Sequence, residues 1–435
     1  MRQASPTEEL SAQVEDLRER RLAAGSDFFE AEAERIARLC HRLAERFARG
    51  GRLFALGATP AARSDARHVA VEFVHPVIVG KHALPALALT AEGGPVDAQL
   101  AMLAEADDMV IAFGAVADRQ IQRALRSARE RGSLTIAFPT GAAGDNQGAS
   151  NGADADARMA AGEADAAGWA FELPGEDESV DQELVETLYH VLWELVHVFF
   201  EHRGLLAGRT ERRVHDTGAS SFLYPFLSEQ EHDLEAVVAD VRESVLMKAR
   251  EASELRARTL TEAGPTLVAG ALALRSCFGS GGRLLALGNG GSATDAIDVV
   301  ADLRFGMAAH PTRRSRPALD LTEDTGILTA IANDVGVEAI FSRQVIAHGR
   351  RGDALLVLST SGGSANVIHA LAEARRRGLV TIAFVGYDGG RIFAEGLADH
   401  VVVVRSEHIP RIQEAQASAY HVLCELVETA AQAPA

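Results

Sequence analysis

The stretches GGRLFALG (50–57) and GGRLLALG (281–288) decide the fold of this chain, because each is a short apolar strand pattern and the two are nearly identical. A second pair repeats at the same distance. YHVLWELV begins at Tyr189 and YHVLCELV begins at Tyr420, and both pairs are 231 residues apart. The chain of 435 residues is therefore expected to hold two copies of one domain in tandem.

Apolar strand patterns alternate with amphipathic helices in both copies. The strand patterns read RLFALG, ALPALALT, MVIAFG, TIAF and WAFEL in the first copy, and RLLALG, RPALDLT, ALLVLST, TIAF and HVVVV in the second. A long helix is expected to lead each copy, at about 27–49 and 229–278. Apolar strands separated by helices predict a parallel sheet that is covered on both faces. We therefore expect an α/β fold of two tandem, doubly wound, flavodoxin-like domains that form a pseudo-dimer.

Composition shifts indicate where the domains end. We expect a first domain over 1–202, a linker over 203–228 and a second domain over 229–435, because the linker stretch is polar. The first copy also contains a segment rich in Gly, Ala, Asp and Asn at 141–168, without large apolar residues. This composition predicts a surface loop.

Charge and hydropathy exclude several classes of partner. The net charge of −18 argues against nucleic-acid binding, which needs clustered Lys and Arg. No apolar run approaches the roughly 20 residues that cross a bilayer, and the N-terminus lacks a signal-peptide core, so no membrane partner is expected. The scattered Cys40, Cys277 and Cys424 are typical of buried thiols in a reducing, cytoplasmic protein.

Two loops of the second copy have the composition of phosphate sites. They read Gly288-Asn289-Gly290-Gly291-Ser292 and Ser359-Thr360-Ser361-Gly362-Gly363-Ser364, and each joins a strand to a helix. Glycines let the backbone approach an anion, and the helix N-terminus supplies N–H donors. Two such loops at the carboxyl edge of one sheet favour phosphate binding over simple turns with helix caps. The hydroxyls expected to hold phosphate are those of Ser292, Ser359, Thr360, Ser361 and Ser364.

The first copy lacks these donors. Its corresponding loops read Gly57-Ala58-Thr59-Pro60-Ala61 and Phe113-Gly114-Ala115-Val116-Ala117-Asp118. Phe113 aligns with Ser359, and Asp118 aligns with Ser364. A bulky apolar ring and a carboxylate would block or repel a phosphate, so we expect no phosphate in the first copy.

These motifs carry a family resemblance. GNGGSATDA, LTAIANDVGVEAIFSRQV, LSTSGGSANVIHAL and RIQEAQASAYHVL resemble the sugar isomerase (SIS) domain, and most closely its phosphoheptose isomerase branch. The resemblance covers nearly all of the second copy and, more faintly, the first. It implies a tetrameric enzyme that converts sedoheptulose 7-phosphate to glycero-manno-heptose 7-phosphate with a divalent metal, usually zinc, beside the sugar. It also implies that Asn289, Gly290 and Asp334 contact the substrate.

The resemblance further implies a set of metal and acid–base residues. In this branch a His and a Glu lie four residues apart on the helix after the first loop, and a Gln and a His lie eight apart on the last helix. With one inserted residue allowed, the first copy keeps the whole set, as His68, Glu72, Gln182 and His190. The second copy has Asp298, Asp302, Gln413 and His421 at these positions.

The two copies have therefore kept complementary parts, which predicts one active site shared between them. We expect an aldose–ketose isomerase of a phosphorylated sugar that works through an enediolate, with Glu72 as base and His190 as acid–base group. A metal held by His68, Glu72, Gln182 and His190 would polarise the carbonyl. The expected assembly is a homodimer of tandem chains that resembles the family tetramer.

Two alternatives remain open from the sequence. The first is a site within the second copy that uses Asp302 as base with Asp298, Gln413 and His421. Asp is one methylene shorter than Glu, so its reach falls by about 1.5 Å, which is enough to slow catalysis. The second alternative is a non-catalytic regulatory or assembly protein that binds a sugar phosphate. Retention of the four residues in the first copy favours the enzyme.

Overall fold

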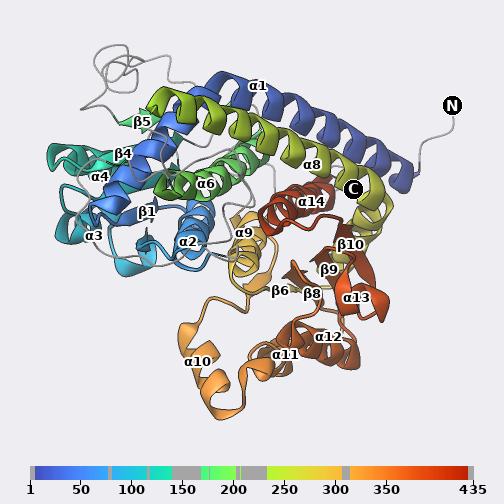
Figure 1. Ribbon diagram of the computed structural model, residues 1–435. Coiled ribbons are helices and arrows are strands. Elements are labelled where there is room, and N and C mark those ends of the chain that lie inside the picture. Colours follow the sequence, from blue (N-terminus) through green and yellow to red (C-terminus); the bar gives the residue numbers. More distant parts are fainter. Residues whose placement is uncertain are drawn as a thin grey trace, which may run out of the picture. The chain divides into compact units, whose positions relative to one another are not determined.

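The computed structural model of the protein describes residues 5–76, 81–114, 118–139, 168–175, 177–201, 206, 233–305 and 314–429. The chain divides into two compact units (Figure 1). We call Ser26–Arg250 the N-terminal unit, and Met1–Gly25 together with Glu251–Ala435 the C-terminal unit. The expected linker and the 141–168 segment lie outside the described residues, apart from Leu206 and Gly168. No helix in the described part of the chain has the length and apolarity needed to cross a membrane.

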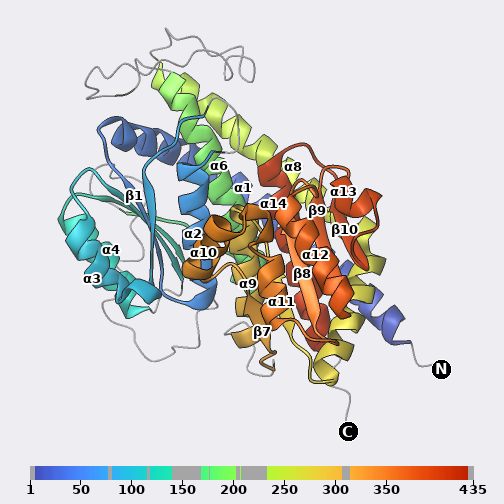
Figure 2. The same cartoon turned by 90° about the horizontal axis from the view of Figure 1, so that it is seen from below.

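The N-terminal unit is built on a parallel sheet. Its strands are β1 (Leu53–Gly57), β2 (Ala86–Thr90), β3 (Met109–Gly114), β4 (Leu134–Pro139) and β5 (Trp169–Ala170), in the order β2-β1-β3-β4-β5. Its helices include α2 (Pro60–Val74), η1 (Ala91–Gly93), α3 (Val96–Leu103), α4 (Arg119–Glu130) and α6 (Glu178–Glu201). Figure 2 shows α3 and α4 on one face of this sheet and α2 and α6 on the other.

The C-terminal unit repeats the same topology. Its strands are β6 (Leu284–Leu287), β7 (Ala318–Asp320), β8 (Ala354–Ser359), β9 (Val380–Gly386) and β10 (His400–Val404), in the order β7-β6-β8-β9-β10, with all pairs parallel. Its helices include α9 (Gly291–Phe305), α10 (Thr325–Asp334), η3 (Val337–Ala339), α11 (Ser342–His348), α12 (Ala365–Arg377), α13 (Gly390–Ala394) and α14 (Ile409–Thr429). Both sheets thus have the flavodoxin-like order 2-1-3-4-5, which confirms the α/β doubly wound fold expected from the repeat.

Alternation along the central strands explains why helices cover both faces of each sheet. In β6, Leu284 and Ala286 belong to an apolar core that includes residues of α9 and α14. Leu285 and Leu287 belong to a second core, which includes residues of α11 and α12. Because successive side chains of a strand point to opposite faces, a strand that is apolar throughout must be covered twice.

The two longest helices are each divided between the units. These are α1 (Pro6–Ala48) and α8 (Leu234–Gly279), and the unit boundaries fall inside them. Residues 1–25 thus belong with the second copy, and residues 229–250 belong with the first, which differs from the domain boundaries expected from the repeat.

The N-terminal half of α1 is held in the C-terminal unit by apolar packing and by an ion pair. Leu10, Val14 and Leu17, at helical spacing, are at most 5% exposed and lie in the core that includes α8 and α14. Arg21 extends this contact, because its Nη2 lies 3.2 Å from Oε1 of Glu425. The start of α8 is held in the N-terminal unit in a comparable way, where Lys248 pairs with Glu194.

A buried aspartate fixes the start of the central strands in each unit. Asp108 accepts hydrogen bonds from Arg52 N (2.7 Å), Arg52 Nη2 (2.8 Å) and Glu105 N (2.7 Å). In the C-terminal unit, Asp353 accepts hydrogen bonds from Arg283 N (3.1 Å) and from the backbone of Arg350 (3.0 Å). Burial acts to raise the pKa of Asp108, but the hydrogen bonds from Arg52 and the backbone outweigh burial and lower it.

We expect Leu17→Ala to destabilise the C-terminal unit by about 2–5 kcal/mol, because it leaves a cavity in a packed core. Both tryptophans of the chain, Trp169 and Trp193, lie in the N-terminal unit. Thermal unfolding should therefore show a lower midpoint by circular dichroism and an unchanged midpoint by tryptophan fluorescence. Leu43→Ala is the matched control, because Leu43 is also fully buried but lies in the N-terminal unit. An equal shift of the fluorescence midpoint in both variants would contradict this division of α1.

We expect Asp108→Asn to lower the free energy of unfolding by about 1–3 kcal/mol at neutral pH, since buried donors lose a charged acceptor. The pKa of this carboxyl is lower in the folded chain than its ordinary value. Its contribution to stability is therefore complete above about pH 4 and is lost as the pH falls through the folded-state pKa. Urea unfolding at pH values from 7 down to about 2 measures this. A difference between the variant and the wild type that does not change with pH would refute the assignment.

Candidate functional site

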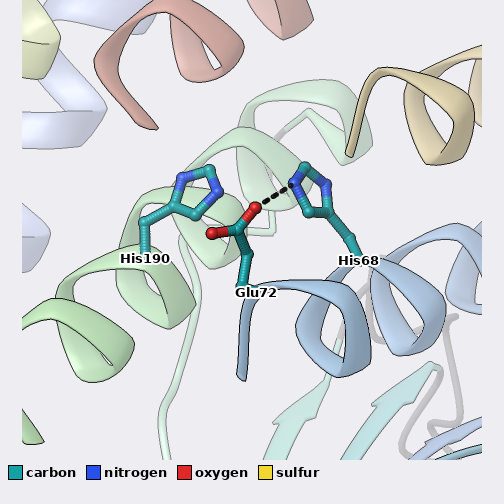
Figure 3. Close-up of side chains that lie close together, drawn as sticks. All are labelled: His68, Glu72 and His190. Carbon is teal, nitrogen blue, oxygen red and sulfur yellow. Dashed lines mark ion pairs between the residues drawn. The ribbon is translucent and has the colours of Figure 1, made fainter. Parts of the chain in front are cut away.

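Two imidazoles and a carboxylate meet in the interior of the N-terminal unit. His68 and Glu72 lie one turn apart on α2, and His190 lies on α6. Nε2 of His68 is 3.7 Å from Oε1 of Glu72, and the ring centroids of His68 and His190 are 5.1 Å apart. Figure 3 shows the Glu72 carboxylate between the two rings. Each of the three residues is at most 2% exposed.

Local sequence sets the position of α2 and hence of this group. Thr59 caps the helix, since its Oγ1 accepts a hydrogen bond from Ala62 N (3.2 Å), and Pro60 occupies the first helical position. His68 and Glu72 then fall on one face of the helix, because they are four residues apart. This face meets α6, which packs against α2.

The three side chains fit a divalent cation. One ligand atom from each of His68, Glu72 and His190 lies within 4.8 Å of the other two. Two imidazoles and one carboxylate are a donor set that suits zinc and similar ions. Oε2 of Glu72 is buried and accepts no hydrogen bond within the described part of the chain. A cation would satisfy a carboxylate oxygen that is otherwise costly to bury.

Gln182, the fourth expected ligand, also reaches α2. Its Nε2 donates to Oγ of Ser64 at 3.5 Å, and Ser64 lies one turn before His68. Gln182 itself lies two turns, or about 12 Å of helix rise, before His190. The structure thus brings three of the four residues into one group and places Gln182 beside the preceding turn of α2.

Tyr189 is a residue of this group that sequence reasoning missed. Its hydroxyl lies 3.0 Å from Nδ1 of His68, the ring nitrogen that faces away from Glu72. A partner at this nitrogen orients an imidazole and selects its tautomer. The signal was present in the repeat, because a tyrosine directly precedes the last-helix histidine in both copies.

The corresponding residues of the C-terminal unit meet differently. Oδ2 of Asp298 lies 2.7 Å from the Tyr420 hydroxyl and 3.1 Å from Nε2 of His421. Oδ2 of Asp302 lies 4.0 Å from the same His421 nitrogen. Gln413 is buried two turns earlier on α14. Asp298, Asp302 and His421, three of the four residues of the alternative site, are therefore brought together. The contacts among them are a hydrogen bond and ion pairs.

The two expected phosphate loops are joined at the carboxyl edge of the C-terminal sheet. Asn289 and Asn366 exchange amide hydrogen bonds, with Nδ2 to Oδ1 distances of 3.0 and 2.9 Å. This pair ties the first loop to the start of α12, and sequence reasoning missed Asn366. In the second loop, Oγ of Ser359 accepts a hydrogen bond from Gly362 N at 3.2 Å. Gly362 has φ +59°, and a Cβ there would lie 2.2 Å from the Gly389 carbonyl oxygen, so only glycine fits.

The serine and threonine side chains of these loops differ in exposure. Ser292 and Ser359 are buried, Thr360 and Ser364 are half-buried, and Ser361 is exposed. Ser364 is the residue before α12, and its side chain makes no capping hydrogen bond to the first turn of this helix. Of the N–H groups of that turn, Val367 N donates to Oδ1 of Asn366 (2.9 Å), and none donates to the Ser364 side chain. A phosphate at a helix start needs such donors.

In the N-terminal unit, a side chain caps the corresponding helix start. Oδ1 of Asp118 accepts hydrogen bonds from Gln120 N (2.8 Å) and Ile121 N (3.2 Å) at the first turn of α4. Phe113 is fully buried at the end of β3. The carboxylate therefore takes the donors that a phosphate would need, and adds a negative charge.

Asp334 is placed apart from these loops. It is the last residue of α10, a helix without buried residues, and its Oδ1 accepts a hydrogen bond from Nδ2 of Asn333 at 2.7 Å. Figure 1 shows α10 at a distance from the strands of its own unit. The structure thus does not bring Asp334 to Asn289 and Gly290, with which the resemblance grouped it.

Comparison with known proteins assigns the family. Residues 249–386 match the SIS domain family. The phosphoheptose isomerase of Roseiflexus sp. is 45% identical over 178 residues, which are 40% of this chain and 87% of that protein. The phosphoheptose isomerase of Geobacter metallireducens is 42% identical over 190 residues, which are 43% of this chain and 97% of that protein.

A solved structure resembles the chain over a longer span. Tagatose-6-phosphate ketose/aldose isomerase from Escherichia coli matches with a TM-score of 0.54 and 14% identity, over 98% of this chain and 92% of that one. At this identity the likeness concerns the fold alone. The shorter relatives decide the family, because nearly their whole length aligns at more than 40% identity. This chain belongs to the phosphoheptose isomerase family of SIS-domain proteins.

Proposed function

We propose that this protein is an aldose–ketose isomerase of a phosphorylated sugar, and specifically that it converts sedoheptulose 7-phosphate to glycero-manno-heptose 7-phosphate. The observation that carries the proposal is the buried group of His68, Glu72 and His190. A protein that only senses a sugar phosphate needs phosphate donors, but it has no use for a carboxylate between two imidazoles. The relatives named phosphoheptose isomerase, two of which are 45% and 44% identical over the aligned residues, support the substrate class.

The residues of this group can carry out the proton transfers. Isomerisation removes a proton from the carbon beside the carbonyl, forms an enediolate and returns a proton to the former carbonyl carbon. We assign the carbon proton to Glu72, whose Oε2 accepts no hydrogen bond within the described residues. His190 would move the second proton between the two oxygens. Nε2 of His68, 3.7 Å from Oε1 of Glu72, would lie beside the carboxylate as a second ligand of the metal ion.

The same residues would hold the metal ion. We propose His68, Glu72 and His190 as ligands of a divalent cation, zinc being the best match to this donor set. When bound, such an ion polarises the carbonyl and stabilises the negative charge that develops on oxygen.

We further propose that the substrate is shared between a phosphate site of the C-terminal unit and the acid–base group of the N-terminal unit. The proposal rests on complementary losses. Asp118 occupies the helix start in one unit, and Asp298 stands at the histidine position in the other. Neither unit has both parts, so the proposal is the same whether the two parts belong to one chain or to two chains of a homodimer.

The alternative base, Asp302, is less favoured by the contacts around it. His421 would be its acid–base partner, yet Nε2 of His421 lies closer to Asp298 (3.1 Å) than to Asp302 (4.0 Å). The imidazole is thus engaged with a second carboxylate. The regulator alternative differs in a simpler way, because it predicts binding without turnover.

We expect Glu72→Gln to lower kcat for sedoheptulose 7-phosphate by about 10³-fold, because general-base catalysis contributes about 10²–10⁴-fold. Asp302→Asn should change kcat by less than about threefold. Production of the aldose is measured with EDTA-treated protein, before and after zinc is added back. The opposite ranking of the two variants would favour a site within the C-terminal unit. Absence of turnover with every divalent metal would refute the isomerase and leave the regulator.

We expect Ser364→Asp, which copies Asp118 into the C-terminal unit, to raise KM by about 100-fold or more. The carboxylate would take the N–H donors of α12 and repel the phosphate. Ser364→Ala is the matched control and should raise KM by only about tenfold, because it removes a single hydroxyl. Equal KM values for the two variants would mean that the phosphate is not held at the start of α12.

A further inference from the structure

A single carboxylate joins the last-helix tyrosine and histidine of the C-terminal unit. Oδ2 of Asp298 lies 2.7 Å from the Tyr420 hydroxyl and 3.1 Å from Nε2 of His421. These three residues are at most 3% exposed. A carboxylate can only accept hydrogen bonds, so both Tyr420 and His421 donate to it. Two donors of the same unit thus stabilise the buried Asp298 carboxylate.

This arrangement occupies the nitrogen that a metal would need. An imidazole binds a metal through the lone pair of an unprotonated nitrogen, but Nε2 of His421 holds its proton toward Asp298. A cation there would have to displace this proton and break the buried hydrogen bond between His421 and Asp298. Asp302 does not complete a ligand group. Among the described residues of the C-terminal unit alone, no three His, Cys, Asp or Glu ligand atoms lie within 4.8 Å of one another.

The equivalent tyrosine of the N-terminal unit, Tyr189, can accept a hydrogen bond where Tyr420 donates one. The Tyr189 hydroxyl lies 3.0 Å from Nδ1 of His68, and a phenol can accept as well as donate. When Nδ1–H donates to Tyr189, Nε2 of His68 presents its lone pair toward Glu72, 3.7 Å away. At one position of the helix pair, Asp298 stands where the N-terminal unit has His68. The tyrosine of the last helix can therefore orient a metal ligand in the N-terminal unit, whereas it donates a hydrogen bond to a carboxylate in the C-terminal unit.

We propose that each chain binds one divalent cation, in the N-terminal unit, and that Asp298, Tyr420 and His421 close the equivalent position of the C-terminal unit to metal. The proposal rests on the metal part of the proposed function and not on turnover. It assigns the C-terminal cluster a structural role, in which hydrogen bonds from Tyr420 and His421, and not a metal ion, stabilise the buried carboxylate.

The number of zinc ions per chain tests this directly. The full-length protein is stripped with EDTA, equilibrated with Zn²⁺, freed of excess ion and analysed for bound zinc. We expect one zinc per chain for the wild type, close to none for His68→Ala, and one for His421→Ala. Two zinc ions per wild-type chain, or loss of zinc in His421→Ala, would overturn the proposal.

The two tyrosines provide a matched pair of conservative variants, which keeps the test valid if the histidine variants fold poorly. We expect Tyr189→Phe to weaken the Kd for zinc by about 10-fold or more, as loss of a group that orients a metal ligand does. Tyr420→Phe should leave that Kd unchanged and lower the Tm equally with EDTA and with zinc, because it removes a hydrogen bond to Asp298 and touches no proposed metal ligand. Equal weakening of zinc binding by both variants would contradict the proposal.

Failure of this inference can be told apart from failure of the proposed function. One zinc per chain, lost in His68→Ala, supports the inference even if sedoheptulose 7-phosphate is not turned over, in which case only the isomerase is refuted. Turnover by a protein with two zinc ions per chain would support the isomerase and overturn the inference.

Discussion

Both side-chain clusters depend on the packing of two helices, namely the helix that follows the first strand of a unit and the last helix of that unit. In the N-terminal unit these are α2 and α6, and in the C-terminal unit they are α9 and α14. The strand order 2-1-3-4-5 places this pair on one face of the parallel sheet. Polar side chains between the two helices are consequently buried, so each needs a hydrogen bond, an opposite charge or a metal.

Duplication has allowed the same helix pair to meet this requirement in two ways. In one unit a carboxylate lies between two imidazoles, and one of its oxygens accepts no hydrogen bond within the described residues. In the other unit a carboxylate stands where an imidazole would be, and it receives hydrogen bonds from Tyr420 and His421. The backbone topology is conserved between the units, whereas the chemistry of the buried polar groups differs. A fold of this kind therefore does not by itself define a site.

For the loops at the strand ends, it is the C-terminal unit that keeps the features of a binding site and the N-terminal unit that has lost them. In the C-terminal unit, the amide pair of Asn289 and Asn366 joins the two loops, and Ser364 does not cap the helix that follows. In the N-terminal unit Asp118 caps the corresponding helix and Phe113 fills the space at the strand end. Each change is stabilising for the unit that carries it, since a capped helix and a filled core cost less than an open anion site. Loss of binding in one copy and its retention in the other are thus both physically consistent with a stable duplicated chain.

Sequence alone was enough to predict the repeat, the strands of both sheets, the doubly wound fold and the family resemblance. Short-range patterns carry this information, because apolar periodicity and glycine loops are local properties. Only the tertiary structure decided which unit receives residues 1–25, since the apolar spacing of Leu10, Val14 and Leu17 shows that they are buried but not against which core. It also decided the roles of Tyr189 and Tyr420, which the sequence shows as identical. Their hydroxyls meet a histidine in one unit and an aspartate in the other, and this contact exists only when two helices far apart in the chain are packed together.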